Sequence, residues 1–105
     1  MDKDKRIQEL SILQQNVANI SAQKQQFTTQ LKDFNSAFKA LEKTNSSYKI
    51  IGNIMIAADK EDLKKDIKEK SEIISAKVKI LEKQEIKLQE KAATMQKEIM
   101  SNLSE

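Results

Sequence analysis

The sequence has no cysteine, no histidine and no proline among its 105 residues, and it contains a single glycine. Without cysteine there is no disulfide and no thiol chemistry, and without histidine the usual Cys/His metal sites are excluded as well. The missing histidine also removes most arrangements in which a base activates a nucleophile. One glycine cannot form a glycine-rich phosphate loop. We therefore expect no enzyme, and neither a cofactor nor a metal.

Charged residues make up 33% of the chain, and the two signs are interleaved rather than grouped in blocks. The net charge of +3 arises in residues 1–58, which carry 8 basic and 5 acidic side chains, whereas residues 59–105 carry 11 of each. A nucleic-acid-binding protein should present a basic stripe, which this pattern lacks. No apolar run approaches the length of a membrane span, and the charged start of the chain leads into no apolar signal region. We expect a cytoplasmic protein that binds neither nucleic acid nor membrane.

Apolar residues in the first part of the chain follow a heptad pattern, with gaps that alternate between three and four residues. This spacing keeps one apolar stripe on one side of a helix and predicts a coiled-coil helix over about residues 5–44. The positions of the stripe are Leu10, Leu13, Val17, Ile20, Phe27, Leu31, Phe34, Phe38 and Leu41. Only Lys24 interrupts it. A polar residue at such a position either fixes the register between two helices or extends its charged group out to solvent, and both interpretations stay open here.

A short segment rich in β-branched residues follows, in which residues 48–51 and 54–57 are separated by Gly52 and Asn53. Two such runs around a two-residue turn predict a β-hairpin over about residues 47–58, and glycine at the first turn position suits a type II′ turn. Alternation of the side chains places apolar residues on both faces. Because a two-stranded hairpin is marginal in water, this pattern favours pairing with hairpins of other subunits into a closed β-barrel. The predicted oligomerisation residues are Tyr48, Ile50, Ile51, Gly52, Asn53, Ile54, Met55 and Ile56.

A second helix is predicted over about residues 59–103, with Asp59 as its N-cap and acidic residues in its first turn. Its apolar column contributes to the coiled-coil core with Ile67, Ile74, Val78, Leu81, Leu88 and Met95. Three isoleucines, Ile73, Ile80 and Ile86, lie off this column, and they either widen the buried face toward a neighbouring subunit or are scattered surface residues. The two helices are of similar length, so they can return alongside each other. The predicted fold is mainly α, in one domain over residues 1–105: a long antiparallel two-helix coiled coil joined by a single β-hairpin that pairs into an oligomeric barrel.

The two ends of the chain meet at the far end of such a coil, and several apolar residues there fall off the heptad seam. Exposed apolar side chains at a fraying helix end suit weak and adaptable contacts, and methionine is well adapted to irregular partners. The alternative is that these residues only close the last turns of the coil. The apolar residues at these helix ends are Ile7, Leu10, Ile12, Leu13, Ile99, Met100 and Leu103.

The stretch from Tyr48 to Ile56 resembles the hairpin of β-class prefoldin subunits, in which Tyr-Lys-x-x-Gly precedes an apolar strand. The second helix is also similar to this family around Lys83-Gln84-Glu85. The resemblance covers nearly the whole chain, and a single hairpin places it in the β class rather than the α class. The sequence is similar to both the archaeal β subunit and the sixth eukaryotic subunit.

This resemblance implies a subunit of a heterohexameric co-chaperone that works without ATP. Its implied partners are other prefoldin subunits of the α and β classes, a group II chaperonin and unfolded client polypeptides. The hairpins would build the platform, and the helix ends would bind clients and deliver them to the chaperonin. The alternative function is a coiled-coil structural or tethering subunit of a multiprotein complex with one defined partner.

Overall fold

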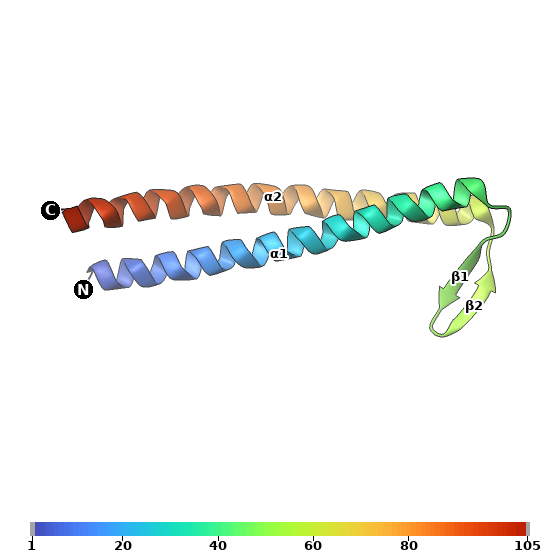
Figure 1. The fold of residues 1–105 in the computed structure, drawn as a ribbon, viewed down its shortest axis with the longest axis horizontal. Coiled ribbons are helices and arrows are strands. Elements are labelled where there is room, and N and C mark those ends of the chain that lie inside the picture. Colours follow the sequence, from blue (N-terminus) through green and yellow to red (C-terminus); the bar gives the residue numbers. More distant parts are fainter. Residues whose placement is uncertain (1, 105) are drawn as a thin grey trace. The chain divides into compact units, whose positions relative to one another are not determined.

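A computed structural model describes the backbone of residues 2–104 and the side chains of residues 3–102. Four elements follow one another along the chain (Figure 1). They are helix α1 (Asp2–Lys43), strands β1 (Tyr48–Ile51) and β2 (Ile54–Ala57), and helix α2 (Lys60–Ser104). The predicted fold class, two long helices joined by one antiparallel hairpin, is confirmed. Assignment of the whole chain to one domain and closure of the hairpin into a barrel stay predictions.

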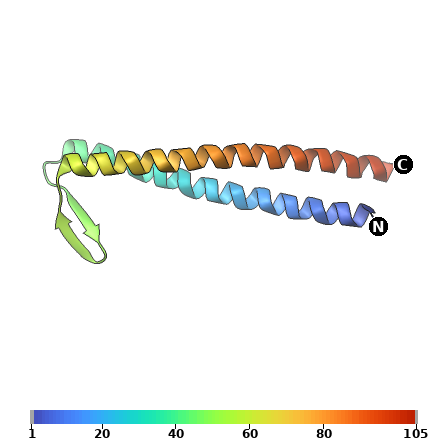
Figure 2. The same ribbon diagram turned by 180° about the vertical axis from the view of Figure 1, so that it is seen from behind.

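The helices contribute to two compact units. The terminal unit consists of residues 1–26 and 78–105, and the hairpin unit consists of residues 27–77. Within the terminal unit the two helical segments lie side by side and run in opposite directions, so that the first turns of α1 and the last turns of α2 are at the same end of the unit (Figures 1 and 2). Within the hairpin unit the remaining turns of α1 and α2 also lie side by side, and the β1–β2 ribbon extends away from them (Figure 2).

In each unit the interior is an apolar seam between its segments of the two helices. Leu13, Leu41 and Ile99 are buried, and the other side chains of the predicted coiled-coil core are half-buried. Two helices cannot surround a seam, so each core side chain keeps one flank toward solvent. Burial is therefore shallow along the whole length of both helices.

Lysine side chains cover part of the aromatic surface in the hairpin unit. The ammonium of Lys64 lies 5.6 Å from the centre of the Phe38 ring, and that of Lys77 lies at the same distance from the Phe27 ring. An ammonium over a ring face is attracted by the ring quadrupole while its aliphatic stem covers apolar area. These lysines therefore shield phenylalanines that two helices alone leave half-buried.

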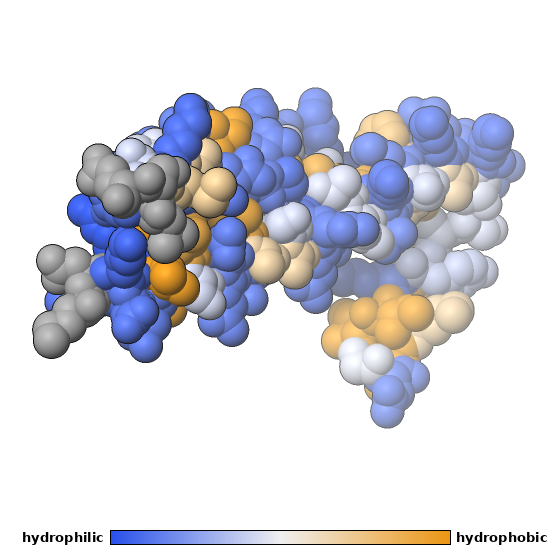
Figure 3. All heavy atoms as spheres, turned by 60° about the vertical axis from the view of Figure 1, so that its left-hand side comes forward, coloured by the Kyte–Doolittle hydropathy of each residue, from blue (hydrophilic) through white to orange (hydrophobic). Residues whose placement is uncertain are grey.

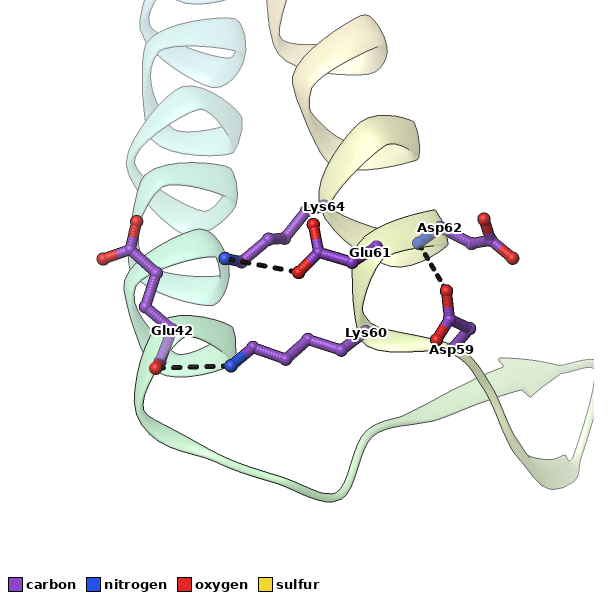
Figure 4. A network of polar contacts seen from close by, with 6 residues as sticks. All are labelled: Glu42, Asp59, Lys60, Glu61, Asp62 and Lys64. Carbon is purple, nitrogen blue, oxygen red and sulfur yellow. Dashed lines mark hydrogen bonds and ion pairs between the residues drawn. The ribbon is translucent and has the colours of Figure 1, made fainter.

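The start of α2 is fixed by the N-cap that the sequence predicts (Figure 4). The backbone N–H of Asp62 donates to a carboxylate oxygen of Asp59 at 3.3 Å, which confirms that prediction. Lys60 reaches back across the connection and donates to the backbone carbonyl of Glu42 at 3.4 Å. This carbonyl belongs to the last turn of α1, where a cation also complements the helix dipole. The two helices are thereby linked directly beside the hairpin.

Lys24, the one polar residue in the apolar stripe of α1, forms an ion pair with Glu85 in the terminal unit. Lys24 Nζ lies 2.9 Å from Glu85 Oε1, and the two side chains are 29% and 12% exposed. The hydrogen bond to Glu85 raises the pKa of Lys24 above its ordinary value; burial partly opposes this, and the charges of Glu85 and Glu82 reinforce it. Lys24 therefore pairs within the seam rather than extending its ammonium into solvent alone.

The raised pKa of Lys24 predicts a loss of stability at alkaline pH. The contribution of the charged pair is complete below the unfolded-state lysine pKa of about 10.4, and it is lost as the pH rises through the higher folded-state pKa. We expect the Tm of the wild type to fall relative to that of the double variant Lys24→Gln/Glu85→Gln above about pH 10.4, and to run parallel to it below. Thermal unfolding followed by circular dichroism measures both. Parallel Tm curves through the whole alkaline range would show that Glu85 does not hold the proton on Lys24.

Candidate functional site

The hairpin is an antiparallel ribbon closed by a tight turn. Its register pairs Tyr48 with Ala57 at the open end and Ile51 with Ile54 beside the turn. Gly52 has φ = 60°, and no other described residue has positive φ. Positive φ at the first turn residue alone defines a type II′ turn, so this prediction is confirmed. Below the strands, the N–H of Ala58 donates to the carbonyl of Ser47 at 2.9 Å, which continues the ladder to the base of the ribbon.

Both faces of this ribbon are apolar. Directly paired residues point to the same side, so one face carries Tyr48, Ala57, Ile50 and Met55. The opposite face carries Ile51 and Ile54, together with Ile56 and its partner Lys49. The large apolar side chains of the two strands are between 46% and 67% exposed, and Figure 3 shows the hairpin as an apolar surface. A two-stranded sheet also leaves both outer edges with unpaired backbone groups. The ribbon thus has two faces and two edges available for contact.

The apolar residues near the chain ends divide into an exposed and a buried set. Ile7, Ile12 and Met100 are exposed, whereas Leu13 and Ile99 are buried in the seam of the terminal unit. Leu10 is half-buried. The side chain of Leu103 lies outside the described residues. Ile7, Ile12 and Met100 therefore face solvent, whereas Leu10, Leu13 and Ile99 contribute to the seam of the terminal unit.

A groove lies between the two helices in this same unit. It has a volume of about 240 Å³, and its walls come from Glu9, Ile12, Leu13, Asn16, Lys91 and Met95. Ile12, Leu13 and Met95 are its apolar lining residues, and Glu9 on α1 and Lys91 on α2 contribute opposite charges. The sequence interpretation assigned Met95 to the core and did not single out Glu9, Asn16 or Lys91. The available signal was the spacing of residues 9, 12, 13 and 16, which share one face of a helix.

The three isoleucines off the α2 seam are also exposed. Ile73 in the hairpin unit and both Ile80 and Ile86 in the terminal unit have more than half of their side-chain surface in solvent. They are not part of the buried face within this chain. Both interpretations, packing against a neighbouring subunit and scattered surface positions, stay open.

The described residues contain neither a membrane-spanning helix nor a cluster of metal-ligand side chains. In residues 2–104, neither helix has a segment long and apolar enough to cross a membrane. Across the same part of the chain, acidic side chains form no group of three or more that could hold a metal ion. The exposed hairpin and the helix ends are the candidate functional surfaces.

Together these features define a class of protein: an assembly subunit whose two-helix coil carries an exposed apolar hairpin. Comparison with known proteins places it more narrowly. A family model described as prefoldin subunit matches residues 4–105. The crystal structure of the prefoldin beta subunit from Thermococcus strain KS-1 superposes with a TM-score of 0.90 at 27% identity, covering 97% of this chain and 92% of that chain.

Two archaeal relatives support the same placement. Prefoldin subunit beta of Archaeoglobus fulgidus is 34% identical over 101 residues, which cover 93% of this chain and 87% of the relative. Prefoldin subunit beta of Methanothrix thermoacetophila is 29% identical over 100 residues, which cover 92% and 83%. The chain belongs to the prefoldin subunit family, and within it to the β class.

The turn at the tip of the hairpin provides a direct test of the ribbon geometry. Replacing Gly52 with Ala forces a side chain into positive φ, which costs about 1–2 kcal/mol even though nothing lies within 4 Å of the added Cβ. We expect cross-strand amides to exchange with solvent about 5- to 30-fold faster, as measured by native-state hydrogen exchange. The matched control is Asn53→Ala, because Asn53 does not have positive φ. Equal acceleration in both variants would contradict the type II′ assignment.

Proposed function

We propose that this chain is a subunit of a heterohexameric, ATP-independent chaperone of the prefoldin type, acting in the cytoplasm without catalysing a reaction. In this proposal it holds unfolded polypeptides at its helix ends and delivers them to a group II chaperonin. The observation that carries the proposal is the hairpin with two exposed apolar faces, found in a chain that belongs to the β class of this family.

Assembly follows from what the hairpin exposes. Burying apolar surface stabilises a protein by about 25 cal/mol per Å², and an apolar ribbon exposed to water lacks this stabilisation. The backbone N–H and C=O groups at its two edges also have only water as hydrogen-bond partners. Hairpins of other α-class and β-class subunits supply both missing partners, because strand pairing satisfies the edges and barrel closure covers one face. The apolar character of the second face favours further packing between hairpins.

Client holding relies on apolar side chains that the coil itself does not use. Ile7, Ile12 and Met100 are exposed, and they lie in the unit that contains both chain ends. Each contact with a client is weak, but several arms on one platform raise the effective concentration of binding sites. Leu10, Leu13 and Ile99 contribute by holding the helix ends in place. Such holding competes with client aggregation and requires no nucleotide.

The assembly part of the proposal is tested at the hairpin. The variant Ile50→Lys/Ile54→Lys places charges on opposite faces of the ribbon, where burial in a closed barrel would cost several kcal/mol for each unpaired charge. We expect loss of the complex with partner subunits in native mass spectrometry, while circular dichroism still shows helical arms. The matched control is Lys49→Ala, which removes the one charge already present on the strands. An intact hexamer with both lysines would disprove assembly through the hairpins.

The client-binding part is tested by separating exposed side chains from seam side chains. The variant Ile12→Ser/Met100→Ser removes two apolar side chains that are 58% and 61% exposed, and the control Ile86→Ser removes one of similar exposure (54%) in the same unit. Loss of about 1 kcal/mol of binding free energy for each side chain reduces the affinity of the complex for a client about fivefold. We therefore expect the variant complex to stay intact but to suppress client aggregation less well. The measurement is light scattering of a denatured test protein.

Two outcomes of that experiment have distinct meanings. Equal loss of suppression in the Ile86 control would contradict client binding at the helix ends. A wild-type complex that protects no unfolded protein but binds one folded partner would support the tether function instead.

A further inference from the structure

We propose that the Lys24–Glu85 ion pair is a register determinant, which permits one alignment of α1 against α2 and excludes alignments shifted by a heptad. The pair lies within the terminal unit, with its charged atoms 2.9 Å apart and Glu85 only 12% exposed. Lys24 is the one polar residue in the apolar stripe of α1. Glu85 belongs to a second series of seam positions on α2, spaced by seven residues, which also contains Val78, Ala92 and Ile99. The inference concerns how the helices pair and does not depend on the proposed function.

A seam made only of apolar residues specifies alignment weakly, because a repeat of seven matches itself after a shift of seven. If α2 moved by one heptad in one direction, Lys24 would lie opposite Val78 and Glu85 opposite Val17. Apolar residues would still meet apolar residues at most other positions. Two charges, however, would be left in the seam without partners, which is strongly destabilising. The ion pair therefore acts together with the link between Lys60 and Glu42 beside the hairpin in separating the observed alignment from one shifted by a heptad.

Net stability does not explain this pair. Removing two charges from water offsets most of the attraction between them, and apolar side chains of similar size in such positions are often as stable or more stable. The second ion pair between the helices of this unit, Arg6–Glu98, has a similar distance of 2.8 Å. Its side chains are 43% and 53% exposed, so solvent can hydrate either charge after a shift. Of the two, only Lys24–Glu85 penalises misalignment.

The alignment has a consequence for the groove near the chain ends. Ile12 and Leu13 come from α1, whereas Lys91 and Met95 come from α2, so the groove exists only in one register. A shift of one heptad moves the two helices by about 10 Å past each other, which separates these walls. Lys24 and Glu85 are thus positioning residues for a surface that they do not touch.

The absence of cysteine from the chain allows the register to be read by engineered disulfides. The native reporter is Leu13→Cys/Met95→Cys, because both side chains line the same groove. The slipped reporter is Leu13→Cys/Leu88→Cys, whose partner lies one heptad earlier in α2. Each reporter is placed in four full-length backgrounds, the first of which is the wild type. The variant Lys24→Leu/Glu85→Leu removes the ion pair, and Lys24→Glu/Glu85→Lys exchanges its two charges. The control Arg6→Leu/Glu98→Leu removes the exposed ion pair instead. The fraction of intramolecular disulfide is measured by mass spectrometry after equilibration in a glutathione buffer.

We expect the slipped disulfide to stay at background in the wild type, in the charge exchange and in the Arg6/Glu98 control. In Lys24→Leu/Glu85→Leu it should rise at least about tenfold while the helices remain folded with an equal or higher Tm. A slipped disulfide that stays at background in this folded variant would overturn the proposal. So would loss of helicity in the same variant, because the pair would then act as a net source of stability. A rise in the Arg6/Glu98 control would assign the register to exposed charges instead.

Discussion

The whole structure depends on an apolar seam that only two helices share. A helix pair can cover one stripe on each partner but cannot enclose it, so even the core side chains retain a solvent-facing flank. Leu13, Leu41 and Ile99 are the most deeply buried apolar residues among those described, and they belong to separate turns of the coil rather than to one compact core. Stability is therefore distributed along the helices. The ion pairs and lysine–aromatic contacts that cross the seam matter because little else fixes its details.

The hairpin and the seam satisfy opposite requirements. The seam is closed within one chain, and its capping interactions at Asp59, Lys60 and Glu42 end where the hairpin begins. The hairpin is closed within the chain only at its turn and along a single ladder, and both of its faces stay exposed. The apolar contacts that the helices form lie within the chain, whereas the apolar faces of the hairpin have no counterpart among the described residues.

The sequence predicted the elements of the fold because each one rests on local rules. Heptad spacing, an N-cap at Asp59 and a Gly52–Asn53 turn act over a few residues, and the structure contains all three. The helix-end residues were harder to assign because exposure depends on the partner helix. Leu13 and Ile99 stood beside Ile12 and Met100 as equal candidates, yet the first two are buried and the last two are exposed. The partner of Lys24 was hidden for the same reason, since Glu85 lies 61 residues away along the chain.

Apolar and charged residues supply different things in this molecule. Apolar side chains provide attraction without strict geometry, both in the seam and on the exposed hairpin faces. Attraction of that kind tolerates misalignment, so a coil made only of such contacts would have several registers of similar energy. A charge inside the seam adds a constraint, because an apolar residue opposite it leaves the charge without compensation. The groove between α1 and α2 combines both kinds, with apolar walls at Ile12 and Met95 between the charges of Glu9 and Lys91. Its adaptable surface therefore depends on the strict alignment that Lys24 and Glu85 provide some turns away.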